Sequence, residues 1–156
     1  MKLLELPSTI ILSYDLINVL STKQRQPYLD RLNIHNYNFI AGPYFINNNH
    51  WLALIIDMTE NHLLLLDPLL KRSTEVDSAM QSWIKYYESR LDHRTIEWSI
   101  KQVDHPIQTD SINCGVFVIR FIELYILHSK IHFQTTAESL EIDRSNIAKS
   151  IIYFNS

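Results

Sequence analysis

Two apolar runs separated by a short polar turn dominate the centre of the chain. Residues His50–Asp57 are apolar on both faces of an extended chain, which is typical of a central strand. A second apolar run, His62–Leu66, ends at Asp67-Pro68. Because residues 58–61 alone connect the two runs, they predict an antiparallel hairpin. The start of the first strand then lies beside the end of the second, so we expect His50 and Asp67 at the same edge of the sheet.

A longer apolar run follows a polar loop and predicts a buried helix. From Cys114 to Leu127 the residues are apolar almost all round, and only Arg120 and Glu123 interrupt them clearly. Cys114 therefore lies at the start of this helix. The unpaired backbone N–H groups and the positive end of the helix dipole favour a negatively charged sulfur there. Gly115 has no side chain, so a substrate backbone could approach the sulfur closely.

Weaker patterns predict further elements on either side of these runs. They are a short helix after Ser13, a helical turn over Tyr28–Leu32, an extended segment over Tyr37–Phe45, an amphipathic helix over residues 77–90, a half-exposed strand over Thr95–Val103 and a closing amphipathic helix over Ala137–Phe154. No repeat, low-complexity tract or linker interrupts them. We therefore expect residues 1–156 to form a single domain.

Composition and charge narrow the function classes. A chain of 156 residues with 46% apolar and 20% charged content can bury a real core. A net charge of -3 provides no basic face for nucleic acid and no polybasic membrane patch. A single cysteine excludes an internal disulfide and a multi-cysteine zinc site, and it fits a reducing compartment. Glu5 and Pro7 interrupt any signal core, and no run approaches the length of a membrane span.

The candidate chemistry is hydrolysis by a cysteine nucleophile. It needs a thiolate, an imidazole that takes and returns a proton, a group that orients the imidazole, and donors for an oxyanion. The candidates are Cys114, His50, Asp67 and Gln108, in that order. Each has an ordinary explanation on its own: a small buried cysteine, a loop-edge histidine, a turn-forming aspartate before proline, and a solvated glutamine. These ordinary explanations are less convincing for the four residues together. The hairpin brings His50 and Asp67 close to each other, and the loop and helix supply Gln108 and Cys114.

Three short motifs carry a family resemblance. His50-Trp51 opens an apolar strand, Asp67 ends the next strand, and Gln-x-x-x-x-x-Cys-Gly-Val occupies Gln108 to Val116. In order and approximate spacing these motifs resemble the ubiquitin-like-protein proteases of the SUMO-protease (sentrin-specific) type, with the adenovirus protease as a more distant relative. The segment Leu12–Asn18 resembles a degenerate form of the family's N-terminal helix start.

The resemblance implies both a fold and a set of roles. The fold is papain-like α+β in circularly permuted order, with a central, mostly antiparallel sheet packed against a buried helix that starts at the catalytic cysteine. Cys114 would attack the substrate carbonyl, His50 would carry the proton, and Asp67 would orient His50. Gln108 and the backbone N–H of Cys114 would stabilise the oxyanion. No metal or organic cofactor is implied.

The implied substrate is the C-terminal Gly-Gly of a ubiquitin-like modifier, held in a narrow tunnel. Trp51 would roof the tunnel and Gly115 would admit the substrate backbone. The family's second tunnel tryptophan corresponds to Ile11, its helix-start aspartate to Tyr14, and a loop glycine to Ser111. SUMO, another ubiquitin-like modifier, ubiquitin and a peptide precursor all stay open as substrates. We expect a monomer that binds neither nucleic acid nor membrane and acts inside a cell, in cytoplasm or nucleus, or inside the host cell if it is a bacterial or viral effector.

Two other functions stay open from the sequence. Effector acetyltransferases of the same clan use a similar triad to carry an acetyl group on sulfur, but they need an acyl-CoA site, and the chain has no evident basic cluster. A catalytically silent module that binds a ubiquitin-like protein is the other possibility. The complete set of triad residues argues against it.

Overall fold

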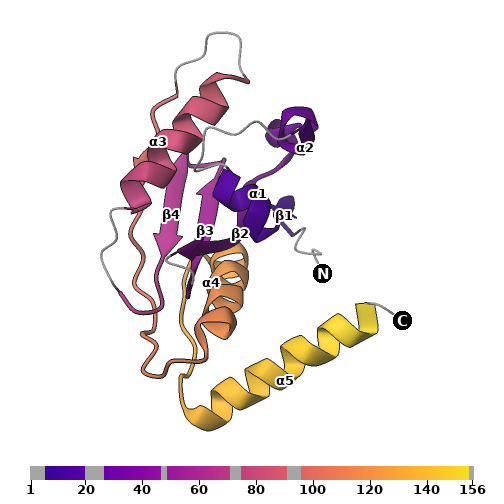
Figure 1. Cartoon of the computed structure of the whole chain (residues 1–156), viewed down its shortest axis with the longest axis vertical. Coiled ribbons are helices and arrows are strands. Elements are labelled where there is room, and N and C mark those ends of the chain that lie inside the picture. Colours follow the sequence, from indigo (N-terminus) through magenta and orange to yellow (C-terminus); the bar gives the residue numbers. More distant parts are fainter. Residues whose placement is uncertain (1–5, 20–26, 47–48, 71–74, 91–95, 155–156) are drawn as a thin grey trace, which may run out of the picture.

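The structure is a computed structural model that describes residues 6–19, 27–46, 49–70, 75–90 and 96–154. In this part of the chain a mixed five-stranded sheet is combined with five α-helices and a short 3-10 helix, Ile34–Asn36 (Figure 1). The architecture is therefore α+β. The strands are β1 (Thr9–Ile11), β2 (Phe39–Ile46), β3 (His50–Asp57), β4 (His62–Leu66) and β5 (Ser99–Ile100). The α-helices are α1 (Tyr14–Val19), α2 (Pro27–Arg31), α3 (Glu75–Glu88), α4 (Cys114–His128) and α5 (Ala137–Phe154).

The strands lie in the order β1-β2-β3-β4-β5. The two central pairings, β2 with β3 and β3 with β4, are antiparallel, as expected. Both edge strands add in parallel, which makes the sheet mixed. The predicted hairpin is confirmed, and both of its strands have the predicted bounds. None of the helices in the described part of the chain combines the length and apolarity that a membrane crossing requires.

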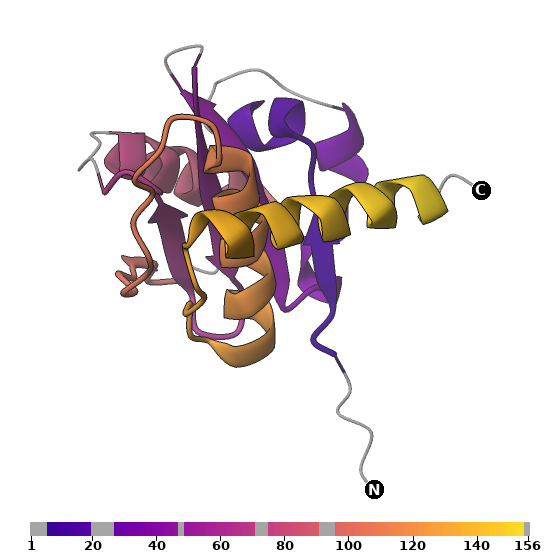
Figure 2. The same ribbon diagram turned by 90° about the horizontal axis from the view of Figure 1, so that it is seen from below.

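Side chains on the two faces of the sheet pack into separate hydrophobic clusters. Along β3, Leu52 and Leu54 join one cluster, whereas Ala53 and Ile55 join the other. The first cluster includes residues of α1 and α3, and the second is filled largely by α4. Figures 1 and 2 show α4 on one face of the sheet and α1 and α3 on the other. Burial on both faces explains why β3 lacks a polar and apolar alternation.

Gly42 lets α1 lie directly on β2. A Cβ atom at this position would lie 2.4 Å from the carbonyl oxygen of Leu12 and 2.5 Å from Cγ1 of Ile17. Such contacts are shorter than atoms tolerate, so only glycine permits this approach. The close packing fixes the start of α1 beside the sheet, where the chain enters from Ile11.

The two long C-terminal helices are less buried than the sequence predicts. Helix α4 begins at Cys114 as expected, but one side is open to solvent, with Ile119 45% and Leu127 44% exposed. Helix α5 has its predicted bounds but does not close the core. Leu140 is buried, whereas Ile151 is 60% exposed on the same helical stripe. The reason is visible in Figure 1, where the far turns of α5 extend away from the rest of the molecule.

The predicted strand over Thr95–Val103 is largely wrong. Only Ser99–Ile100 pairs with β4, in parallel with His62 and Leu63. The preceding residue, Trp98, packs its ring against Trp83 and Tyr87 at centroid distances of 5.3 and 5.1 Å. Burial of this large ring in an aromatic cluster, rather than a continuous ladder, accounts for the apolar alternation. Thr95 lies outside the described residues.

Candidate active site

Strands β3 and β4 bring a histidine and an aspartate into direct contact. His50 opens β3, and Asp67 follows the last residue of β4. The Nε2–H group of His50 donates a hydrogen bond of 2.6 Å to Oδ1 of Asp67. The two side chains are only 12% and 8% exposed, so this charge-assisted bond is shielded from bulk water. The predicted proximity of the two residues is confirmed.

A tight turn after β4 holds the carboxylate in place. Oδ1 of Asp67 also accepts a bond of 2.8 Å from the backbone N–H of Leu69. The carbonyl oxygen of Asp67 accepts another, of 2.9 Å, from the N–H of Leu70, whose positive φ of 50° closes the turn. With Nε2 bound to Asp67, the neutral His50 ring has Nδ1 as its proton acceptor. The turn and the strand pair therefore fix the orientation of the His50 ring at this edge of the sheet.

The start of α4 supplies the sulfur. Cys114 is its first residue, and its thiol is free and half-buried. Helix α4 packs against β2 and β3. In Figures 1 and 2 the N-terminal end of α4 lies at the same end of the sheet as the start of β3 and the end of β4. Cys114, His50 and Asp67 thus belong to one end of the sheet, together with the unpaired N–H groups of a helix start.

Gln108 lies in the loop before α4 and is buried rather than solvated, with 5% of its surface exposed. Its backbone N–H donates a 2.8 Å bond to the carbonyl oxygen of Pro68, which ties this loop to the turn after Asp67. Its side-chain Nε2 donates to Asp110, at 2.8 Å to the carbonyl oxygen and 3.2 Å to Oδ1. Oε1 of Gln108 has no partner among the described residues. The side-chain amide is directed at its own loop, and the role of Gln108 as an oxyanion donor stays a prediction.

Comparison with protein families settles the relationship of the chain. The model of the Ulp1 protease family, C-terminal catalytic domain, matches residues 21–153. The chain belongs to this family, which consists of cysteine peptidases. The match includes His50, Asp67, Gln108 and Cys114. No curated protein sequence matches the chain.

Solved structures with the Ulp1-family fold resemble this chain at low sequence identity. The SUMO protease Ulp1 with its catalytic cysteine oxidised to a sulfonic acid has a TM-score of 0.67 and 18% identity, over 88% of this chain and 66% of that one. The Ulp1 protease domain in complex with Smt3, the yeast ortholog of SUMO, has a TM-score of 0.66 and 16% identity, over 90% of this chain and 66% of that one. The Xanthomonas campestris effector XopD bound to ubiquitin has a TM-score of 0.60 and 13% identity, over 88% of this chain and 77% of that one. The chain thus spans slightly under two thirds of the length of these two Ulp1 chains.

Of the residues expected at the substrate tunnel, Trp51 has two aromatic neighbours, and neither of them was expected there. The Trp51 ring packs against Phe45 at 4.4 Å and, edge to face, against Tyr14 at 5.7 Å. The aromatic partner of Trp51 from the N-terminal segment is therefore Tyr14, at the start of α1. Ile11 ends β1 and is 57% exposed. A Cβ atom at Gly115 would meet nothing within 4 Å, which leaves open space beside Cys114.

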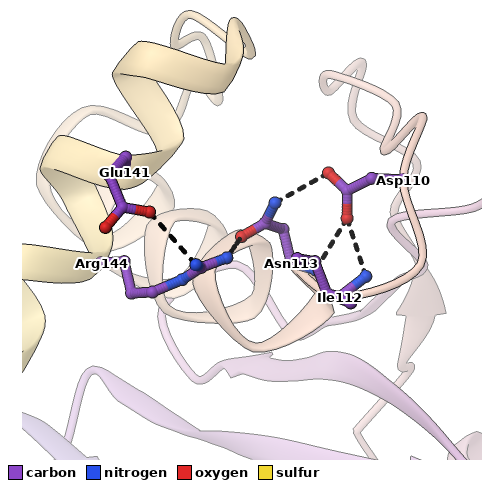
Figure 3. Close-up of polar contacts among 5 residues, drawn as sticks. All are labelled: Asp110, Ile112, Asn113, Glu141 and Arg144. Carbon is purple, nitrogen blue, oxygen red and sulfur yellow. Dashed lines mark hydrogen bonds and ion pairs between the residues drawn. The ribbon is translucent and has the colours of Figure 1, made fainter.

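Three residues that hold the loop between Gln108 and Cys114 were not among the predicted site residues. Asp110 and Asn113 hydrogen-bond to each other within this loop, and Arg144 reaches Asn113 from α5 (Figure 3). The polar pair Asp110 and Asn113 is visible as a spacing typical of a side-chain turn. Arg144 has no such signal, because a contact across this sequence distance depends on where α5 lies. Within the described ranges, no three His, Cys, Asp or Glu side chains gather as metal ligands would.

Proposed function

We propose that this chain is a cysteine peptidase that hydrolyses the bond after the C-terminal Gly-Gly of a ubiquitin-like modifier, with residues 1–156 as one catalytic domain. The observation that carries the proposal is the buried 2.6 Å bond between His50 and Asp67, at the end of the sheet where α4 begins with Cys114. Membership of the Ulp1 family supports the same reaction.

The acylation step follows from this arrangement. Nδ1 of His50 takes the proton from the Cys114 thiol, and Asp67 stabilises the imidazolium through Nε2–H. The thiolate attacks the glycine carbonyl carbon and forms a C–S bond, while the carbonyl electrons move to oxygen. The backbone N–H of Cys114 and the side chain of Gln108 stabilise this oxyanion. Collapse of the intermediate breaks the C–N bond, and His50 returns its proton to the departing amine.

Deacylation uses the same groups in reverse roles. Nδ1 of His50 takes a proton from water, which attacks the thioester carbonyl and forms a second oxyanion. The C–S bond breaks, and His50 returns its proton to the Cys114 sulfur, which restores the thiol. The modifier leaves as a C-terminal acid that loses its proton to water. Gln108 can serve in both steps by exchanging its longer bond, the 3.2 Å contact to Oδ1 of Asp110, for a bond to the oxyanion. Its Oε1 has no described partner to lose when the amide turns.

Gln108→Ala is expected to lower kcat by roughly 10²- to 10³-fold with little change in KM, because an oxyanion donor acts mainly in the transition state. Steady-state kinetics on a C-terminal aminocoumarin substrate would measure both constants. Thr109→Ala, a change at the exposed neighbouring residue, is the matched control. An effect on KM alone would assign Gln108 to substrate binding instead.

The substrate class is proposed from two observations about related structures. One Ulp1 structure holds Smt3, and the XopD structure holds ubiquitin, so members of this fold group accommodate both kinds of modifier. We propose that the chain takes the C-terminal tail of such a modifier between Trp51 and the exposed Gly115 and acts on it as a monomer inside a cell. Bacterial effectors with this fold, such as XopD, are compatible with action inside a host cell.

A panel of full-length SUMO, ubiquitin and other modifiers carrying a C-terminal aminocoumarin tests the proposed function. Release of the fluorophore from at least one modifier, with cleavage after the terminal glycine by mass spectrometry, is the expected result. No hydrolysis of any modifier by a folded protein would overturn the proposal. In that case acetyl transfer from acetyl-CoA and simple modifier binding, measured on the same samples, would identify the alternative.

Ile11→Trp is expected to sharpen the preference for Gly-Gly and to lower KM. An indole has a flat face that typically buries about 150 to 250 Å², and the exposed end of β1 has room for it. The present protein should cut substrates with Ala in place of the first Gly at comparable rates. The measurement is kcat/KM on peptide and full-length substrates, with Ile11→Val as the aliphatic control.

One result would show that Ile11 does not form part of the tunnel wall. If the unmodified protein already discriminates against Ala by more than roughly 10²-fold, about 2.7 kcal/mol in transition-state binding, another residue closes the tunnel. Tyr14, whose ring contacts Trp51 at 5.7 Å, is then the residue to replace next.

A further inference from the structure

The side chain of Asn113 does not cap α4, although an asparagine at a helix start usually caps its helix. Asn113 occupies the N-cap position of α4, immediately before Cys114, and is 7% exposed. Asparagine is among the strongest N-capping residues because its Oδ1 can accept a bond from the N–H groups of the first turn. Here it makes no such side-chain capping bond. Its amide is turned away from the helix, so it leaves the first-turn N–H groups to other acceptors.

Two residues hold the amide in this orientation. Nη2 of Arg144, on α5, donates a hydrogen bond to Oδ1 of Asn113, and Nδ2 of Asn113 donates a bond of 2.8 Å to Oδ2 of Asp110. Figure 3 shows the three side chains in a row, with Asn113 between its two partners. Arg144 occupies the one atom of Asn113 that could cap α4. The guanidinium can only donate, so it also fixes which end of the amide faces Asp110.

Asp110 extends the row of contacts to Gln108. Its Oδ1 accepts bonds from the backbone N–H groups of Ile112 and Asn113 at 2.8 and 2.9 Å, and from Nε2 of Gln108 at 3.2 Å. Burial raises the pKa of Asp110, but the bonds from Asn113, Ile112 and Gln108 outweigh it and lower this pKa below its ordinary value. Asp110 therefore stays ionised near neutral pH and remains a strong acceptor. A continuous set of hydrogen bonds thus joins α5 to Gln108, and it passes through Asn113, the residue that directly precedes Cys114.

We propose that Arg144 is a positioning residue for the oxyanion site, because it holds Asn113 off the start of α4 and so keeps the Cys114 N–H and the Gln108 loop in their working geometry. The inference rests on the proposed hydrolytic function. Arg144 does not touch the reacting atoms and acts only through Asn113. Loss of Arg144 frees Oδ1 of Asn113 to turn toward the N–H groups of Gly115 and Val116, the usual partners of an N-cap side chain. That rotation breaks the bond from Asn113 to Asp110 and disturbs the peptide that carries the Cys114 N–H.

Contacts other than those of Arg144 attach α5 to the rest of the molecule. Leu140 is 4% exposed in the cluster that α4 fills, and Asp143 forms a separate ion pair of 3.5 Å with Arg120 of α4. The pairing of Arg144 with Glu141 joins side chains that are 44% and 71% exposed, where ion pairs contribute little to stability. The contact with Asn113 is the feature that distinguishes Arg144 from an ordinary surface arginine.

Arg144→Gln tests the proposal. Its kcat should fall roughly tenfold with KM nearly unchanged, a smaller loss than removal of an oxyanion donor itself, which costs about 10²- to 10³-fold. A peptide aldehyde ending in glycine adds the Cys114 thiol across its carbonyl, and its oxygen occupies the oxyanion site, so its inhibition constant should rise by a similar factor. Alkylation of Cys114 by iodoacetamide forms no oxyanion, and its rate should not change. A general loss of structure would change all three.

A control and a double variant complete the experiment. Asp143→Asn breaks the ion pair between α4 and α5 without touching Asn113, so its kcat should equal that of the parent protein. Asn113→Ala removes the capping oxygen, so adding Arg144→Gln to it should cause no further loss in kcat, whereas independent sites would show additive effects.

The outcomes distinguish a failure of the role proposed for Arg144 from a failure of the proposed function. If the parent protein hydrolyses its substrate and Arg144→Gln matches it in kcat and aldehyde affinity, the positioning role is wrong and the proposed function stands. Additive losses in the double variant, or an equal loss in Asp143→Asn, would also overturn the role of Arg144. If the parent protein does not hydrolyse any modifier, the proposed function itself fails.

Discussion

Cys114→Ser is expected to lower hydrolysis by at least roughly 10⁴-fold, since removal of a triad nucleophile costs up to about 10⁶-fold in kcat. Serine is close in size to cysteine, but its hydroxyl is far harder to ionise than a thiol. The residue is half-buried at the first position of α4, where serine is compatible with a helix start, so the fold should be kept.

The measurement is kcat/KM on the best aminocoumarin substrate, together with a thermal melt of both proteins. Because Cys114 is the only cysteine, a thiol titration of the parent protein counts the nucleophile directly. Retained turnover in the serine variant would show that hydrolysis does not depend on this sulfur.

His50→Ala is expected to reduce kcat to within roughly tenfold of the serine variant, because members of a triad act as a unit and their losses do not add. Asp67→Asn should keep more activity, since the amide can preserve part of the geometry around the ring. The bond of 2.6 Å between His50 and Asp67 gives the physical reason for this order.

At His50, an effect of substitution on stability must be distinguished from an effect on catalysis. Removal of His50 leaves the carboxylate of Asp67, which is 7% exposed, without its side-chain partner, and a buried unpaired charge destabilises a fold. His50→Gln, which retains a polar group, is therefore the matched variant, and only a loss of kcat shared by both variants is assigned to proton transfer. Near-normal kcat in a folded His50→Gln protein would contradict the role of His50 as general base.

The central hairpin could be predicted from the sequence because its signal is local. Continuous apolar runs at His50–Asp57 and His62–Leu66, joined by a short turn, allow one simple pairing, and that pairing alone brings His50 next to Asp67. The helix start at Cys114 is equally local, since the change from polar loop to apolar run marks it. The circularly permuted order relative to papain stays an implication of the family resemblance.

Features that depend on distant contacts could not be predicted. Burial of Trp98 in an aromatic cluster shortened the predicted strand to Ser99–Ile100, and the exposed end of α5 follows from where that helix leaves the body. The contacts of Tyr14 with Trp51 and of Arg144 with Asn113 each join elements far apart in the chain. Periodicity gives the type of an element and its buried face, but not which side chain of another element it meets.

The most direct test of the central claim is trapping of the sulfur by a modifier. SUMO and ubiquitin carrying a C-terminal propargylamide in place of the last glycine would be incubated with the parent protein and with Cys114→Ser, and the products would be mapped by mass spectrometry. The account predicts a covalent adduct of at least one modifier on Cys114 and none with the serine variant. A folded protein whose thiol reacts with iodoacetamide but forms no adduct with any modifier would contradict it.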